Sequence, residues 1–254
     1  MDPPMSWARL PNRWFIASFH GLVSDGIEFS PTNVAIVERE TLTLVCDTYL
    51  GPGSMSTAWQ QFAREGGDVC KPVLVFNSHS DWDHHWGNCF FHGAIVVGHE
   101  HAARAIRENG ARELAEHGHL ATGDVILTPP SKTFEKQFNV DDEITLFHAP
   151  GHTPGSSACY DARNGVLFAG DDVEDPVPWL TTADIPTYID TLEAFLALEP
   201  VHVIPGHGSP APDSSLVSSN LAYLRALERG HDAREFARLE PRIHEHNLDV
   251  LASS

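Results

Sequence analysis

The feature that most constrains this chain is a dense run of metal-binding side chains directly after a short apolar run. Residues Val73–Phe76 have the β-branched, apolar character of a buried strand. Four potential ligands, His79, Asp81, Asp83 and His84, then fall within six residues. Imidazole and carboxylate groups together suit zinc, iron or manganese, and the lack of cysteine in the run argues against a finger-type structural zinc. The sequence therefore predicts a metal site at the end of a strand.

Three later residues stand in a similar local setting. His152, Asp171 and His207 each directly follow a glycine, and each is expected on a tight turn after a predicted strand. Glycine allows the sharp backbone bend that brings a side chain to a crowded point. We therefore expect these residues to join the same site as the earlier run. Asp172 is expected to be a solvated neighbour of Asp171.

The pattern along the chain predicts a mixed α/β fold. Early strands follow one another as a meander and later strands alternate with helices, which favours sheets covered by helices in a layered arrangement. With no linker or repeat evident, residues 1–254 are assigned to one domain that includes the C-terminal stretch 213–254. The predicted strands are 14–20, 33–38, 42–48, 72–77, 94–99, 144–149, 157–161, 166–169 and 201–205. The predicted helices are 57–65, 100–117, 185–198, 216–229 and 233–245.

Taken together, these residues resemble the signature of metallo-β-lactamase-fold proteins. That signature is H-x-H-x-D-H after a strand, then a G-H-T-P-G-type turn, a G-D after another strand, and a late G-H. The chain carries these features at 79–84, Gly151–Gly155, Gly170–Asp171 and Gly206–His207. The resemblance implies an αββα sandwich whose two halves meet at an edge that holds two divalent metal ions.

The resemblance also implies a ligand set for each ion. The first ion would take His79, Asp81 and His152, the second Asp83, His84 and His207, with Asp171 bridging the two. Asp81 departs from the pattern, because the family usually has a histidine there. A carboxylate makes the site harder and shifts the preference from zinc toward iron or manganese. The alternative is that Asp81 points away and leaves a single well-filled metal site.

The activity implied is hydrolysis of a small molecule. Two cations that share a water lower its pKa, so a metal-bound hydroxide would attack an ester, thioester, lactone or amide-type bond, with Asp83 as the catalytic carboxylate. Zinc is the expected metal, with iron or manganese as alternatives. An iron-dependent oxidoreductase or dioxygenase is the competing function, and a non-catalytic metal-binding or sensing protein is a third. No lysine between Asp171 and His207 could pair with a lactam carboxylate in the manner of one zinc β-lactamase group.

Composition limits the partners. The net charge of −19 argues against nucleic acid, and we expect no membrane association, because neither a signal peptide nor a run of 18 apolar residues is evident. Cys46 and Cys159 lie in predicted strands and are expected to be buried thiols in a cytoplasmic protein. A homodimer is left open.

Three further residues carry two interpretations each. His85 either lines a short helix or binds metal directly. His148 is either a satisfied core residue of its strand or supports the His152 turn that follows. Trp179 either forms a wall of the substrate pocket or packs its own loop.

Overall fold

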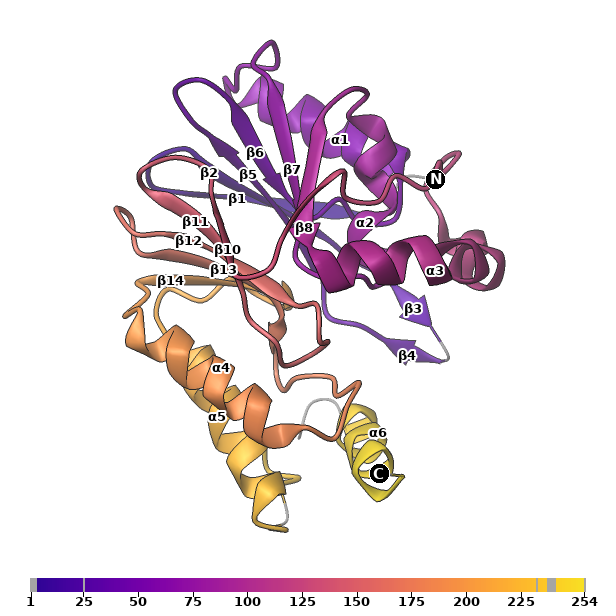
Figure 1. The fold of residues 1–254 in the computed structure, drawn as a ribbon, viewed down its shortest axis with the longest axis vertical. Helices are drawn as coiled ribbons and strands as arrows, with labels where there is room; N and C mark the ends of the chain where they lie inside the picture. Colours follow the sequence, from indigo (N-terminus) through magenta and orange to yellow (C-terminus); the bar gives the residue numbers. More distant parts are fainter. Residues whose placement is uncertain (1–3, 25, 232, 237–240, 254) are drawn as a thin grey trace. The chain divides into compact units, whose positions relative to one another are not determined.

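The computed structural model describes residues 4–24, 26–231, 233–236 and 241–253 (Figure 1). By its internal contacts the chain divides into two compact units. Unit 1 comprises residues 1–22 and 31–136, and unit 2 comprises residues 23–30 and 137–254. Each unit contains its own part of the predicted metal-binding set.

Unit 1 is built on a sheet whose strands lie in the order β1, β2, β5, β6, β7, β8 and β9. Their bounds are β1 Met5–Leu10, β2 Trp14–Phe19, β5 Thr32–Glu38, β6 Thr43–Cys46, β7 Val73–Asn77, β8 Ile95–His99 and β9 Lys132–Phe134. The pairs from β1 to β6 are antiparallel, whereas the pairs from β6 to β9 are parallel. Every residue of β2, β5 and β6 is buried, which agrees with their near-continuous apolar sequence.

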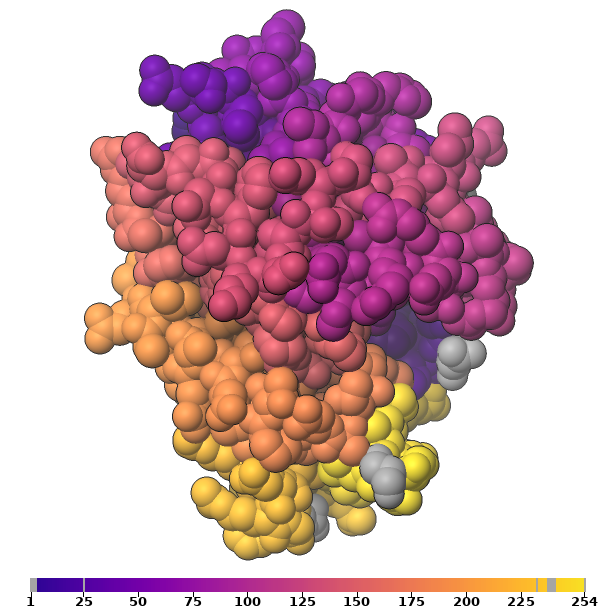
Figure 2. Space-filling model, in the orientation of Figure 1, coloured from indigo at the N-terminus to yellow at the C-terminus, as the bar shows by residue number. Residues whose placement is uncertain are grey.

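The helices of unit 1 follow the strands of its parallel part. They are α1 Pro52–Arg64, the short α2 Trp82–His85 and α3 Glu100–His117, and two 3₁₀ turns cover Trp86–Phe90 and Gly118–Leu120. α3 buries small and apolar residues such as Ala102, Ala103 and Ile106 and exposes charged ones. Its outer face is visible at the surface in Figure 2, in purple and magenta. This arrangement agrees with the alternating charges of its sequence.

Unit 2 contains a second run of strands and the later helices. The strands β10 Gln137–Asn139, β11 Ile144–His148, β12 Ser157–Asp161 and β13 Val166–Glu174 pair antiparallel in sequence order, and β14 His202–His207 pairs parallel to β13. A small hairpin joins β3 Val23–Ser24 to β4 Ile27–Glu28. The helices are α4 Ile185–Ala197, α5 Ser215–Glu228 and α6 Pro241–Ala252. Apolar residues of β13, β14, α4, α5 and α6 form one buried cluster.

The mixed α/β class and most of the predicted elements are confirmed. Helix α3 has the predicted bounds, and Asp184 caps α4 by accepting a hydrogen bond from the backbone N–H of Thr187. Cys46 and Cys159 are buried free thiols as expected. The single-domain assignment stays a prediction.

Three expectations were wrong. β13 continues to Glu174, so Asp171 lies within an irregular strand instead of on a turn after it. β14 likewise extends through His207, which is its last residue. The last helix spans Pro241–Ala252 instead of 233–245, and the chain at 234–236 forms turns. Among the described residues, none of the helices combines the length and apolarity that crossing a membrane requires.

Candidate metal centre

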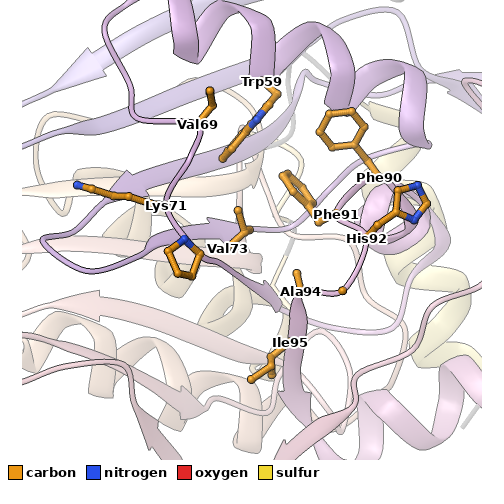
Figure 3. Close-up of a pocket in the computed structure, with 11 residues that line it drawn as sticks. Trp59, Val69, Lys71, Val73, Phe90, Phe91, His92, Ala94 and Ile95 are labelled. Atoms are coloured by element: carbon orange, nitrogen blue, oxygen red, sulfur yellow. The ribbon is translucent and has the colours of Figure 1, made fainter.

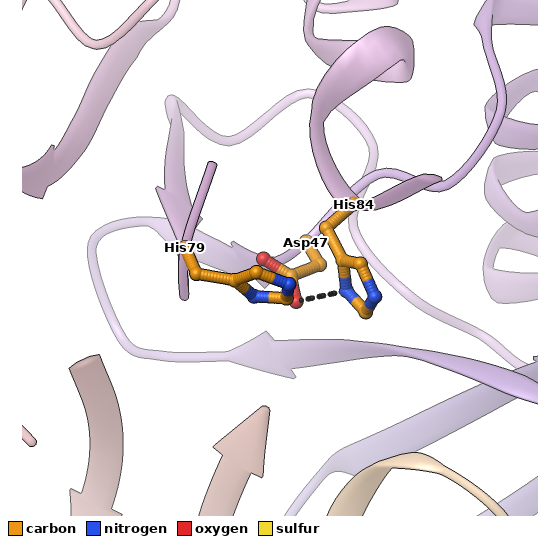
Figure 4. Close-up of side chains that lie close together, drawn as sticks. All are labelled: Asp47, His79 and His84. Carbon is orange, nitrogen blue, oxygen red and sulfur yellow. Dashed lines mark hydrogen bonds and ion pairs between the residues drawn. The ribbon is translucent and has the colours of Figure 1, made fainter. Parts of the chain in front are cut away.

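In unit 1 the candidate ligands gather where parallel strands end. β6 and β7 pair in parallel with Cys46 opposite Phe76, so the residues that follow them emerge at the same edge of the sheet. Asp47 follows β6, and His79 comes two residues after β7. One ring or carboxylate atom each from Asp47, His79 and His84 lies within 4.8 Å of the others, and all three residues are buried. Figure 4 shows these side chains converging.

Asp47 organises this cluster through hydrogen bonds. Its Oδ1 accepts the backbone N–H of Ser78 at 2.8 Å, and its Oδ2 accepts the Ser78 hydroxyl at 2.7 Å. Oδ2 also accepts the Nδ1–H of His84 at 2.9 Å, the bond dashed in Figure 4. The Asp47 backbone lies in the left-handed region at φ 58°, which aspartate tolerates better than most residues. Because its oxygens already accept three hydrogen bonds, Asp47 serves to orient the histidines.

These bonds fix which ring nitrogen of each histidine carries the proton. His84 Nδ1 faces a carboxylate, so it must be the donor. Ser78 gives its only hydroxyl proton to Asp47, so His79 Nδ1, 2.8 Å from Ser78 Oγ, must donate to that oxygen. In its neutral form, each of these two histidines therefore presents Nε2 as an acceptor. His84 Nε2 lies 3.5 Å from Asp83 Oδ2, and His79 Nε2 lies 3.8 Å from Asp81 Oδ2.

Unit 2 repeats this arrangement with backbone carbonyls as the orienting groups. His152 Nδ1 lies 2.9 Å from the Trp179 carbonyl oxygen, and His207 Nδ1 lies 3.1 Å from that of Ser30. A carbonyl can only accept, so both Nδ1 atoms donate. Asp171 Oδ2 lies 3.8 Å from His152 Nε2 and 3.5 Å from His207 Nε2. Asp171 thus faces the two acceptor nitrogens of its own unit.

The donor atoms fit a divalent cation. Their separations of 3.5–3.8 Å are too long for hydrogen bonds. Two ligand atoms bound tetrahedrally to zinc at about 2.1 Å lie roughly 3.4 Å apart, which is close to the observed spacings. Imidazole acceptor nitrogens and carboxylate oxygens are also the ligand types of catalytic zinc and iron sites.

Two buried acidic residues lie at His152 and at the loop that orients it, and the first departs from expectation. Asp172 is 1% exposed, not solvated, and its Oδ1 accepts the backbone N–H of His152 at 2.8 Å. Burial raises the pKa of Asp172 to about 8. Burial and then the negative charge of Asp171 raise the pKa of Glu174 to about 7. Glu174 Oε1 accepts the backbone N–H of Trp179 at 2.8 Å, so this acid fixes the loop that orients His152.

Glycine beside two ligands is required by lack of space. A Cβ atom on Gly206 would lie 1.7 Å from Asp171 Oδ1, and one on Gly151 would lie 2.5 Å from the Tyr188 ring and 2.8 Å from Asp172 Oδ1. Real contacts of this kind do not come below 3.0 Å. The lack of a side chain at Gly206 and Gly151 therefore leaves space for the carboxylates of Asp171 and Asp172.

The remaining residues singled out from the sequence are His85, His148 and Trp179. His85 ends α2, is 1% exposed, and neither ring nitrogen has a hydrogen-bond partner in the described part of the chain. Burial lowers its pKa to about 4, so the ring is neutral. His148 Nε2 lies 3.1 Å from the Pro154 carbonyl and so supports the His152 turn. Trp179 stacks on His246 with ring centroids 3.6 Å apart, so the ring packs its own loop against α6.

The pKa of Glu113, on α3, is also affected by the cluster of unit 1. Burial and the negative charge of Asp81 raise the pKa of Glu113 to about 7, while Arg112 opposes the shift. Glu113 was not singled out from the sequence. Its position among the mixed charges of an amphipathic surface helix gave no signal of burial.

A surface pocket of about 570 Å³ lies elsewhere in unit 1 (Figure 3). Its lining includes Val73 and Ile95, the first residues of β7 and β8. His79 follows the opposite, carboxyl end of β7. With a rise of about 3.3 Å per residue, the length of β7 separates the two by more than 10 Å. The pocket is therefore distinct from the ligand cluster.

Comparisons with known proteins agree with this geometry. A model of the metallo-beta-lactamase superfamily matches residues 27–229. Among curated proteins, the acyl-coenzyme A thioesterase MBLAC2 of Bos taurus is 26% identical over 205 residues, which cover 69% of this chain and 72% of that protein. The Homo sapiens protein of the same name gives the same identity and coverage.

Solved structures show the same fold. The metallo-β-lactamase DIM-1 superposes with a TM-score of 0.70 at 17% identity, covering 89% of this chain and 99% of that one. The mono-zinc form of FIM-1 from Pseudomonas aeruginosa gives 0.68 at 16% identity, covering 89% and 97%. A metallo-β-lactamase from Hirschia baltica gives 0.66 at 20%, covering 87% and 97%. The predicted fold is confirmed.

Proposed function

Because the chain belongs to the metallo-β-lactamase superfamily, we propose that it is a metal-dependent hydrolase of a small-molecule substrate. The single observation that carries the proposal is the common orientation of four histidines. His79, His84, His152 and His207 each direct Nδ1 to a fixed hydrogen-bond acceptor and leave Nε2 beside a carboxylate oxygen. A site built for packing alone has no reason to place imidazole lone pairs against carboxylates.

The proposed ligands are the seven residues assigned from the sequence: His79, Asp81, Asp83, His84, His152, Asp171 and His207. Bound divalent ions supply Lewis acidity and a water of lowered pKa. The chain itself supplies the placement. Asp83, 7% exposed, is the proposed carboxylate that orients the attacking water and accepts its proton. Asp171 is the proposed bridging ligand.

Within this class we propose a thioester as the substrate bond. The support is the similarity to proteins named acyl-coenzyme A thioesterases, over 69% of the chain. Such a substrate is an anionic acyl carrier with an activated carbonyl. A binding region with bound divalent cations offsets the negative charge of an otherwise acidic protein, so charge repulsion does not exclude an anionic substrate.

The test combines metal analysis with a substrate panel. Purified protein is expected to contain zinc, to cleave acyl-coenzyme A thioesters faster than esters, lactones or amides of matched chain length, and to lose activity with chelator and regain it with Zn²⁺. Metal-free protein with undiminished activity would refute the metal-dependent mechanism. Equal rates for the matched ester would refute the thioester preference alone.

Asp81 favours a second candidate, an iron-dependent oxidoreductase. Its carboxylate faces His79 Nε2 at 3.8 Å, so an oxygen ligand stands where the family has a histidine. Asp81→Ala is expected to lose one metal equivalent, while Asp81→His is expected to retain it and to shift selectivity toward zinc. Iron in the purified protein together with oxygen consumption would favour this second function, and zinc with thioester turnover would exclude it. Unchanged stoichiometry in Asp81→Ala would show that Asp81 is not a ligand.

A further inference from the structure

The loop between β13 and α4 contacts both the proposed metal ligand His152 and α6, the last helix of unit 2. The loop touches His152 at both ends of that residue: the Trp179 carbonyl accepts its Nδ1–H, and the Thr181 hydroxyl donates to its backbone carbonyl. The position of this loop therefore decides where the imidazole ring points. The side chain of residue 179 is irrelevant to the first bond, because the acceptor belongs to the backbone.

Two fully buried asparagines hold the backbone of this loop. Asn247 on α6 accepts the Leu180 N–H at 2.9 Å and donates to the Pro178 carbonyl at 2.8 Å. These two contacts flank Trp179 on either side. Asn220 on α5 accepts the Glu174 N–H and donates to the carbonyls of Glu174 and Pro176. Both asparagines are 0% exposed.

α6 adds a second layer of contact at the same point. His246 stacks on the Trp179 ring at 3.6 Å, and its Nε2 lies 2.9 Å from the Leu180 carbonyl. Asn247 is itself fixed, because its amide donates to the Tyr223 hydroxyl at 3.0 Å. α6 begins at Pro241, beyond the residues 27–229 that the family model matches. The contacts from α6 therefore lie outside the residues that the family model matches.

We propose that Asn247 is a positioning residue for metal binding: it fixes the Trp179 carbonyl, which holds His152 in the Nδ1–H tautomer with Nε2 directed at the metal. The inference rests on the proposed function insofar as His152 is a ligand. Groups that orient a ligating histidine typically change metal affinity by roughly 10–100-fold when removed. Loss of Asn247 also leaves the Leu180 N–H and the Pro178 carbonyl buried without their partner, so the loop must shift to regain hydrogen bonds.

The test uses the full chain and two readouts. In metal-free protein, long-range ¹⁵N–¹H NMR of the histidine rings, with His152 assigned by comparison with His152→Gln, is expected to show the Nδ1–H tautomer. Asn247→Ala is expected to convert this signal to a mixture of tautomers and to weaken Zn²⁺ binding roughly 10–100-fold. Asn247→Asp keeps the size and the acceptor for Leu180 but loses the donor to Pro178. Its tautomer mixture and its Zn²⁺ affinity are expected to lie between those of the wild type and of Asn247→Ala. It replaces the alanine variant if that variant does not fold.

The matched control separates positioning from general destabilisation. Ile243→Val removes a buried methyl group from the same helix and touches none of the loop hydrogen bonds. It is expected to lower the free energy of unfolding while leaving the His152 tautomer and Zn²⁺ affinity unchanged. An unchanged tautomer and affinity in both Asn247 variants would overturn the inference. If the wild-type protein fails to bind Zn²⁺, the proposed function fails, and the tautomer readout still decides the positioning role.

Discussion

Asp47→Asn is the sharpest test of how the cluster in unit 1 is built. The substitution keeps the size of the side chain and removes one acceptor. In the wild type, the Ser78 hydroxyl and His84 Nδ1 both donate to Asp47 Oδ2. If the amide oxygen of the variant stays opposite the Ser78 N–H, its NH₂ group takes the place of Oδ2 and faces these two donors. Two donors cannot share a hydrogen bond. His84 must therefore move its proton to Nε2, the nitrogen proposed to bind metal.

The magnitude follows from the bonds lost. A protonated Nε2 cannot bind a cation, so metal binding must first return the proton to Nδ1, against the new NH₂ group. Loss of an orienting partner of this kind weakens metal binding roughly 10–100-fold, which corresponds to about 1.4–2.7 kcal/mol. Hydrogen bonds to a charged acceptor contribute about 1.5–3 kcal/mol each, so the metal-free protein is expected to be destabilised as well.

Chelator competition with Zn²⁺ measures the affinity, and urea unfolding of the metal-free protein measures the stability. Asp161→Asn is the matched control, because Asp161 is also fully buried and accepts hydrogen bonds from Arg163 and Asn164. Its loss is expected to reduce stability only. Zn²⁺ affinity that falls equally in both variants, or in neither, would refute the tautomer reasoning.

Two further predictions use other features of the units. Gly206→Ala places a methyl group 1.7 Å from Asp171 Oδ1, so we expect a loss of roughly 1–3 kcal/mol of stability and weaker Zn²⁺ binding, measured by urea unfolding and chelator competition. Gly118→Ala, whose nearest neighbour would lie at 3.5 Å, is the control, and equal behaviour of the two variants would contradict the prediction. Because the folded-state pKa of Glu113, about 7, exceeds its ordinary 4.5, its neutral form stabilises the fold below pH 4.5, and this contribution is lost as the pH rises through 7. Glu113→Gln is therefore expected to remove this loss of stability and to be roughly 1–3 kcal/mol more stable than the metal-free wild type at pH 8. The control Glu116→Gln, at an exposed position, is expected to show the same pH dependence of stability as the wild type. If Glu113→Gln keeps the wild-type pH dependence, burial of the Glu113 carboxyl does not destabilise its charged form.

The ligand positions and most of the strands were predictable because they depend on local patterns. An apolar run followed by His79 and Asp81 marks a strand end from the sequence alone, and the fold class follows from the order of strands and helices. No local pattern in the sequence marks Asp47 as part of the cluster. Its role depends on the parallel pairing of β6 with β7, which brings it beside Ser78.

The errors have tertiary causes. Asp171 was expected on a turn and Asp172 in solvent, yet both belong, with Glu174, to a buried strand. The His152 N–H, 20 residues away, donates to Asp172, and the Trp179 N–H, from the loop five residues further on, donates to Glu174. The roles of Asn220 and Asn247 were equally invisible, because each depends on a loop more than 40 residues away.

The two units orient their histidines by different means, and this difference determines which positions can change in evolution. In unit 1 the acceptors are side chains, Asp47 and Ser78, so one nucleotide change can retune a ligand. In unit 2 they are the carbonyls of Trp179 and Ser30, which every amino acid possesses. Substitutions that adapt the protein to a new metal, in nature or in directed evolution, are therefore expected to accumulate around Asp47 and Ser78. The carbonyls of Trp179 and Ser30 stay in place as long as the backbone keeps its conformation.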